Sequence, residues 1–227
     1  MLDVIDATTT TTIRNAPADP LSESVASQLG NLAQTLMAHP GRLRTLALVG
    51  CGRGEGTSTL TANLGRYLAT HRARVLMVDA NAHAPALHAI SGAGRAGGLS
   101  ELMDGQIALD AAVKPTAVPD LFVLTAGERP AAGNGLLLAS HLRDRLLKCA
   151  TAYDFVLLDC PCVNVYEDTA SVAAQCDGVI LIVEGGRTLR QSARSAKQLL
   201  MRANCNLLGV FMNKRKFSIP RVLYDRL

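Results

Sequence analysis

The sequence predicts an α/β protein with a doubly wound, mainly parallel sheet, helices on both faces, and a phosphate site like that of P-loop NTPases. Three observations support this. Short apolar runs alternate with helical stretches from residue 45 onward, a glycine-rich turn follows the first run, and aspartates end two others. Near-continuous apolar strands separated by helices indicate a parallel sheet that is covered on both sides. Ligands bind such sheets at the carboxyl ends of the strands.

The predicted elements follow from these patterns. The strands are Thr45–Val49, Val75–Val78, Leu121–Leu124, Phe155–Leu158, Gly178–Val183 and Leu207–Met212. Helices are expected near residues 58–70, 134–151, 165–175 and 187–203, with shorter turns around 85–90 and 98–113. Before the first strand, Ser22 to Ala38 has helical spacing at Val25, Leu29, Leu32 and Leu36. These leucines are expected to pack the helix onto its own domain.

Composition and charge limit the domain organisation. We expect a disordered leader over residues 1–20, which contain a run of threonines, one domain over residues 21–216, and a tail over residues 217–227. The net charge of +4 has no basic block behind it, which argues against nucleic acid as a partner. No apolar run reaches the roughly 18–20 residues that cross a bilayer. We therefore expect a cytoplasmic protein without direct membrane insertion.

The glycine-rich turn has the layout of a phosphate-binding loop. Its candidate cofactor-binding residues are Gly52, Arg53, Gly54, Glu55, Gly56, Thr57, Ser58 and Thr59. Glycines let backbone N–H groups close around phosphate oxygens, and the N-terminus of the following helix adds a positive field. A working loop carries a lysine, where this chain has Thr57, and then a hydroxyl that holds Mg²⁺, here Ser58. The cradle is present and its main catalytic charge is missing.

Two aspartates stand at strand ends that should border the same cleft. Asp79 follows the second strand and Asp159 the fourth. A lone aspartate at such a place often only caps the next turn, but two of them beside a phosphate loop indicate a nucleotide site. We assign Asp79 and Asp159 as catalytic candidates for any remaining activity. Together with Ser58 they are the expected Mg²⁺ ligands.

The six cysteines show no metal-binding or redox spacing, so the simplest interpretation is that they are reduced and buried. Cys51, Cys160 and Cys162 nevertheless follow strand ends beside the expected cleft. A redox-active or metal-binding thiol cluster stays open as an alternative.

Six segments match, in order, the motifs of one family. Gly54–Thr59 with Asn63-Leu64 resembles G-E-G-K-S-T…N-L, Asp79–Pro85 resembles D-A-D-x-R-x-P, and Tyr153–Cys162 resembles Y-D-x-V-I-I-D-T-P-P. Gly98–Gly105, Leu124–Pro130 and Gly209–Lys214 match G-L-S-D-x-L-x-G, L-P-A-G-x-x-P-P-N-P and G-V-V-L-N-R. The chain therefore resembles the cytoplasmic domain of bacterial tyrosine autokinases, ATP-dependent regulators of capsule and exopolysaccharide assembly related to ParA/MinD ATPases. The resemblance implies ATP or ADP with Mg²⁺ as ligands, and Asn213 as the contact to adenine.

The departures from this family are as informative as the matches. Thr57 replaces the loop lysine, and Asn81 replaces the second aspartate of the acidic motif. Ala26 and Leu29 replace two arginines that join neighbouring subunits into a ring, and one tyrosine, Tyr224, stands where the family has its autophosphorylated cluster. These losses affect four separate parts of one mechanism. One lost activity explains them more economically than four independent accidents.

We therefore expect a kinase-like, catalytically degenerate regulatory or scaffold component of bacterial exopolysaccharide (capsule or adhesin) synthesis and export. The resemblance implies a membrane polysaccharide co-polymerase as partner, whose cytoplasmic tail would hold the protein at the periphery of the inner membrane. Binding of Mg²⁺ and ATP or ADP is expected to be weak, and the protein to be a monomer or dimer rather than a ring octamer. One alternative is an active tyrosine autokinase or ATPase in which Arg53 or Arg66 supplies the missing charge. The other is a positioning ATPase like ParA or MinD.

Overall fold

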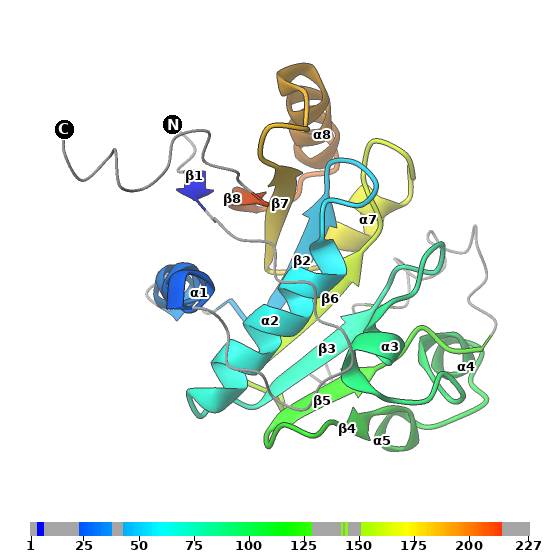
Figure 1. Ribbon diagram of the computed structural model, residues 1–227. Coiled ribbons are helices and arrows are strands. Elements are labelled where there is room, and N and C mark those ends of the chain that lie inside the picture. Colours follow the sequence, from blue (N-terminus) through cyan, green and yellow to red (C-terminus); the bar gives the residue numbers. More distant parts are fainter. Residues whose placement is uncertain are drawn as a thin grey trace.

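The computed structural model describes residues 4–6, 23–37, 43–128, 142, 144 and 151–214. Within these residues, eight strands form one sheet in the order β1-β8-β7-β2-β6-β3-β5-β4 (Figure 1). The strands are β1 (Val4–Asp6), β2 (Thr45–Gly50), β3 (Val75–Asp79), β4 (Lys114–Pro115), β5 (Leu121–Leu124), β6 (Phe155–Cys160), β7 (Gly178–Glu184) and β8 (Leu207–Asn213). All neighbours pair in parallel except β4 and β5. The predicted doubly wound sheet is confirmed.

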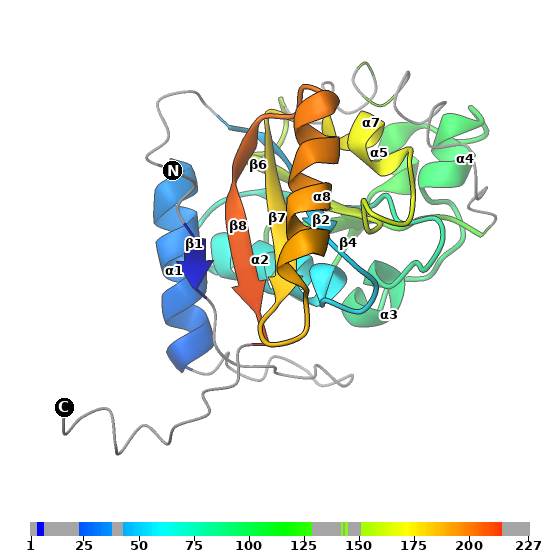
Figure 2. The ribbon, with the colours of Figure 1, turned by 90° about the horizontal axis from the view of Figure 1, so that it is seen from above.

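Helices cover both faces of this sheet. They are α1 (Glu23–Met37), α2 (Thr57–Thr70), α3 (Leu87–Ser91), α4 (Leu99–Met103), α5 (Leu109–Ala112), α7 (Thr169–Ala173) and α8 (Arg190–Arg202). Alternate residues of β2 face opposite sides, as in any strand. Leu46 and Leu48 pack in the core beneath α1 and α2, whereas Ala47 and Val49 pack in the core beneath α7 and α8 (Figure 1 and Figure 2). The two cores fix the sheet, and with it the edge where the strands end.

Helix α1 packs on its own domain, as its leucine spacing predicts. Leu29, Leu32 and Leu36 are buried in the core that α2 shares. The two helices approach closely at Gly30, where an added Cβ would lie 2.8 Å from the Tyr67 hydroxyl oxygen. Leu29 therefore faces inward and is not available to a neighbouring subunit.

The structure departs from the sequence expectations at several boundaries. The helix expected over residues 165–175 is shortened to Thr169–Ala173, because residues 163–168 form turns in which the Cys162 carbonyl accepts two backbone N–H groups. The expected disordered leader contains β1, which pairs with the edge strand β8. An edge strand has unpaired backbone groups, and pairing with β1 satisfies some of them. The expected helix near residues 134–151 and the tail lie almost wholly outside the described residues.

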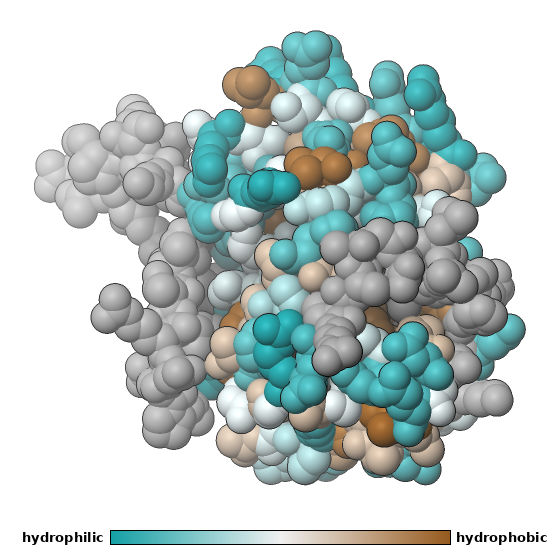
Figure 3. Space-filling view, turned by 90° about the vertical axis from the view of Figure 1, so that its right-hand side faces the viewer, coloured by the Kyte–Doolittle hydropathy of each residue, from teal (hydrophilic) through white to brown (hydrophobic). Residues whose placement is uncertain are grey.

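The described surface has no continuous hydrophobic face in the view of Figure 3, which is mainly hydrophilic with scattered hydrophobic residues. Among the described residues, four large hydrophobic side chains are exposed, namely those of Met37, Val165, Leu189 and Met201. Among the described helices, none combines the length and hydropathy that crossing a membrane requires.

Candidate functional site

The loop between β2 and α2 is shaped by glycines in left-handed conformations. Gly54 has φ +79° and Gly56, which precedes the first residue of α2, has φ +87°. L-residues with a side chain rarely adopt such angles. A Cβ at Gly56 would also collide with the side-chain nitrogen of Asn213. The glycines are thus required both by the turn and by the close approach of β8.

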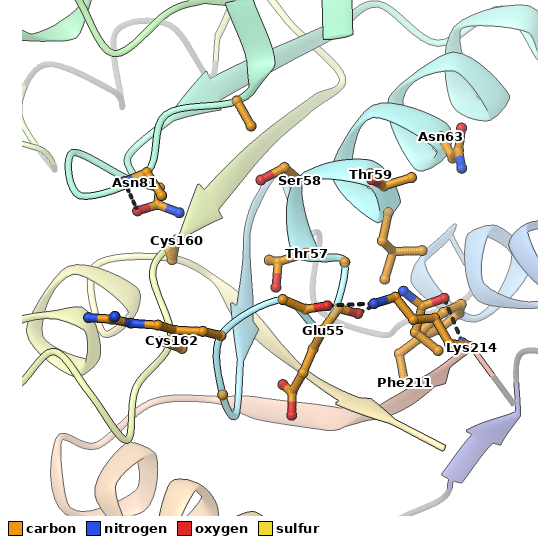
Figure 4. Close-up of a pocket in the computed structure, with 18 of the residues that line it drawn as sticks. Glu55, Thr57, Ser58, Thr59, Asn63, Asn81, Cys160, Cys162, Phe211 and Lys214 are labelled. Atoms are coloured by element: carbon orange, nitrogen blue, oxygen red, sulfur yellow. Dashed lines mark hydrogen bonds between the residues drawn. The ribbon is translucent and has the colours of Figure 1, made fainter. Parts of the chain in front are cut away.

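A cavity of about 650 Å³ opens at this loop (Figure 4). All the residues predicted to bind a cofactor line it, namely Gly52, Arg53, Gly54, Glu55, Gly56, Thr57, Ser58, Thr59 and Asn213. Further lining residues come from other elements, among them Asn63, Asn81, His83, Tyr166 and Lys214. The structure therefore brings the predicted loop and the end of β8 together around one cavity.

Asp79 and Asp159 are direct neighbours on β3 and β6, and both are fully buried. Contrary to expectation, neither lines the cavity; Asn81 and Cys160 lie there instead. For Asp79 the reason is that its carboxylate points beneath the turn that follows its strand. In Asp79, Oδ1 accepts the backbone N–H of Asn81 at 3.2 Å and Oδ2 accepts those of Ala86 and Leu87 at 3.0 Å each. Burial raises the pKa of Asp79 to about 6, although these hydrogen bonds act to lower it.

Asp159 is in a different environment. Neither of its carboxylate oxygens has a hydrogen-bond partner of good geometry among the described residues. Burial, and then the charge of Asp79, raise the pKa of Asp159 well above its usual range, and only the nearby Ser58 hydroxyl acts to lower it. A buried carboxylate without a partner is costly and calls for an explanation such as a cation that binds there.

The pair Ser58 and Asp159 fits Mg²⁺ bound together with a nucleotide. Mg²⁺ in proteins commonly takes one or two carboxylate or hydroxyl oxygens and completes its shell with phosphate and water. No group of three or more His, Cys, Asp or Glu side chains in the described part of the chain is arranged to hold a metal ion. The residues therefore suit a metal that arrives with phosphate oxygens, rather than a self-sufficient metal centre.

Neither arginine proposed to replace the loop lysine points into the loop. Arg53 Nη2 donates to the Tyr166 hydroxyl at 2.9 Å, and the guanidinium lies 5.5 Å from the centre of that ring. The Tyr166 ring also stacks on the His83 imidazole, with a distance of 3.6 Å between the ring centroids. Arg66 does not line the cavity. Thr57 itself turns toward the base of the loop, since its Oγ1 lies 2.9 Å from the position that a Cβ on Gly50 would take.

Sequence reasoning missed Lys214, the residue after Asn213. Lys214 Nζ donates to the Gly54 carbonyl at 2.5 Å and to Glu184 Oε2 at 3.2 Å. Asn213 Nδ2 donates to the Glu55 carbonyl at 2.8 Å. The signal was present in the sequence, because Lys214 is the last residue of the motif that contains Asn213, but only Asn213 was given a role there.

The thiols around the cavity are not of the reactive kind. Cys51, Cys160 and Cys162 are buried. Burial raises the pKa of Cys51 to about 11, with a further contribution from Glu55, and burial also raises the pKa of Cys160 and Cys162. Reactive and metal-binding cysteines need an accessible thiolate, which a lowered pKa favours. The structure thus gives no support to the thiol-cluster alternative.

Comparisons with known proteins agree with this geometry. Residues 43–208 match the family model described as cellulose biosynthesis protein BcsQ. The tyrosine-protein kinase YwqD of Bacillus subtilis (strain 168) is 28% identical over 177 residues, which is 78% of this chain and 75% of YwqD. The solved BceF tyrosine kinase domain superposes with a TM-score of 0.74 at 30% identity, over 86% of this chain and 77% of that domain. The Pyrococcus horikoshii protein MinD, solved with Mg-ADP, shares the fold at a TM-score of 0.63 and 21% identity, over 80% of this chain and 76% of MinD.

Proposed function

The chain belongs to the bacterial tyrosine-kinase family of P-loop proteins, and from this premise we propose that it is a kinase-like regulator or scaffold that transfers phosphate poorly or not at all. Thr57 at the position of the loop lysine is the observation that carries the proposal. Phosphoryl transfer depends on positive charge that stabilises the oxygens of the transferred group. A threonine hydroxyl cannot provide it.

The residues of the site are suited to binding more than to catalysis. The backbone N–H groups at the N-terminus of α2 would bind phosphates, Ser58 and Asp159 would hold Mg²⁺, and Asn213, which lines the same cavity, would contact the base. When bound, Mg-ATP would supply the phosphoryl group. Both oxygens of Asp79 are already engaged by backbone N–H groups, so this carboxylate is not free to take a proton from a substrate hydroxyl.

Nucleotide binding is proposed to be weakened rather than abolished. A charge-assisted hydrogen bond to phosphate contributes roughly 1.5–3 kcal/mol. Losing the loop lysine should therefore reduce affinity about tenfold to a hundredfold. The remaining cradle and the open cavity support retained binding of ATP or ADP with Mg²⁺.

The biological context follows from the family. We propose that the protein acts in exopolysaccharide synthesis and export, docked on the cytoplasmic tail of a membrane polysaccharide co-polymerase and held in this way at the inner membrane. The burial of Leu29 in its own domain supports a monomer or dimer rather than a ring, because this position is where the resemblance places a ring-forming arginine. Light scattering should show a small assembly at low and high salt, and a salt-sensitive octamer would contradict it.

The direct test is incubation of the purified protein with Mg-ATP, followed by an anti-phosphotyrosine blot. We expect no signal from the wild type, and in cells we expect normal polymer from a Tyr224→Phe strain but reduced or altered polymer after deletion of the gene. Asp159→Asn serves as the inactive comparison. A wild-type signal that Asp159→Asn abolishes would replace this proposal by the second candidate, an active tyrosine kinase, which the names of the relatives favour.

A positioning role like that of MinD has less support. At 21% identity, the likeness to MinD concerns the fold alone. Uniform distribution of a fluorescent fusion along the cell, or its coincidence with the polysaccharide machinery, would be expected under the scaffold proposal. Oscillation or a gradient would favour the positioning role instead.

A further inference from the structure

We propose that Lys214 supplies the positive charge of the phosphate site in place of the missing loop lysine. This inference deepens the proposed function, since it concerns the same nucleotide site and names a binding residue in it. The ligand class is a nucleoside di- or triphosphate with Mg²⁺.

Lys214 reaches the loop from the end of β8. Its side chain lines the cavity, and Cε lies 3.6 Å from the point where a Cβ on Gly56 would stand. The ammonium group ends at the Gly54 carbonyl, 2.5 Å away. Figure 4 shows Lys214 beside Glu55, on the side of the loop opposite to Cys162 and Asn81. The side chain thus runs along the two left-handed glycines that form the cradle.

The backbone conformation at Lys214 directs its side chain toward the loop. Lys214 has φ +55°, which is uncommon for a residue with a side chain and persists only where the surroundings hold it. Its N–H donates to Asn213 Oδ1 at 2.9 Å, while Asn213 Nδ2 donates to the Glu55 carbonyl at 2.8 Å. The turn at the end of β8 is therefore hydrogen-bonded to the loop, and it positions the Lys214 ammonium group beside the loop.

Two cations and two carboxylates lie around Gly54. Lys214 and Arg187 share one carboxylate, Glu184, at 3.2 and 3.1 Å. Arg187 Nη1 also lies 3.7 Å from the Cβ position of Gly54. The other nearby carboxylate, Glu55, accepts the Thr188 hydroxyl at 2.6 Å. The two cations thus face two carboxylates, and a phosphate at the loop would compete with Glu184 for Lys214.

Elimination leads to the same residue. Of the residues that the structure describes around the cavity, Arg53 and Lys214 carry a permanent positive charge. Arg53 is engaged with the Tyr166 ring and hydroxyl, beside the turn after β6. Lys214 is the cation that remains next to the loop, and a small rotation of its flexible stem exchanges a carbonyl oxygen or Glu184 for a phosphate oxygen.

A structural role is the competing explanation, because Lys214 also ties β8 to the loop. Calorimetry with Mg-ADP on a double-mutant cycle separates the two. The cycle contains the wild type, Lys214→Gln, Thr57→Lys and the double variant. Lys197→Gln on α8 is the matched control, since Lys197 does not line the cavity.

In the wild-type background we expect Lys214→Gln to weaken Mg-ADP binding at least tenfold, and Lys197→Gln to leave it unchanged. In the Thr57→Lys background, where the loop has its own lysine, the loss from Lys214→Gln should shrink to less than threefold. Equal losses in the two backgrounds, or no loss in the wild type, would overturn the inference.

A second measurement uses the wild-type chain and so does not depend on the folding of a variant. Mg-ADP should slow the acetylation of Lys214, as measured by mass spectrometry, while leaving Lys197 as reactive as before. Unchanged reactivity of Lys214 at saturating Mg-ADP contradicts the inference. A wild type that binds no Mg-ADP overturns the inference about Lys214 and leaves the proposed scaffold function intact. A phosphotyrosine signal overturns the scaffold function and leaves the inference about Lys214 standing.

Discussion

Replacing Asp159 by Asn is expected to stabilise the protein at pH 8 and to have little effect near pH 4. Asp159 and Asp79 are buried neighbours, and burial raises the pKa of both. The folded protein therefore holds these protons more tightly than the unfolded chain, whose carboxyl groups titrate near 3.9. Stability from these groups is fully present below that pH and is lost as the pH rises through the folded pKa.

The structure sets the scale of this effect. For Asp79 the pKa rises from 3.8 to about 6, which corresponds to about 3 kcal/mol at 1.36 kcal/mol per pKa unit. Asp159 is as fully buried as Asp79 and lacks the three hydrogen bonds that Asp79 accepts. Removing its charge, and its repulsion of Asp79, should therefore raise the free energy of unfolding at pH 8, by an amount of the same order as that worked out for Asp79.

Urea denaturation with EDTA present, from pH 4 to pH 8, measures this difference. The variant should show a flatter dependence of stability on pH than the wild type. Asp104→Asn is the matched control, because Asp104 is exposed, and it should follow the wild type throughout. A variant that is less stable than the wild type at pH 8 would show that Asp159 has a stabilising partner, and a gain that is independent of pH would remove electrostatics as its cause.

Three further predictions concern the loop, α1 and the thiols. Gly56→Ala should lower the free energy of unfolding by more than Gly92→Ala, because both glycines have positive φ but only Gly56 has a close neighbour. If both variants lost the same amount, about 1–2 kcal/mol from the backbone angle alone, the side chain of Asn213 on β8 would not be in tight contact with the loop. Leu32→Ala should cost about 2–5 kcal/mol in urea denaturation, whereas the exposed Met37→Ala should stay within about 0.5 kcal/mol, and similar small losses would mean that α1 is undocked. Iodoacetamide at pH 7.5 should leave the thiols of Cys51, Cys160 and Cys162 in the native protein unmodified. Labelling of any of the three would restore the reactive-cluster alternative.

Most of the sheet could be predicted from the sequence because its strands are buried on both faces. The apolar runs of β2, β3 and β6 end within about two residues of the predicted positions, and the register brings Asp79 beside Asp159. Strands β1 and β4 were missed because each is a short edge strand, of three and two residues. Such segments have too few residues to show a period in the sequence.

The candidate site was predictable where it depends on the local sequence, and not where it depends on the direction in which a side chain points. The loop residues surround one cavity, as their spacing indicates. The difference between Asp79 and Asp159 was not predictable, because both follow an apolar strand and only the turn after β3 folds back to hydrogen-bond its carboxylate. The motif pointed to the position of Lys214, but the direction of its side chain depends on a left-handed φ at a strand end, which a lysine does not indicate.

The contacts between β8 and the loop also set the order in which the protein matures during synthesis. Lys214 follows Gly54 by 160 residues and Asn213 follows Glu55 by 158. At about 5–20 residues per second, a ribosome needs roughly 8–30 s to cover that interval. Throughout this time the loop has emerged while two of its anchors are still unmade. The cavity proposed to bind the nucleotide is therefore complete only after the last strand has docked.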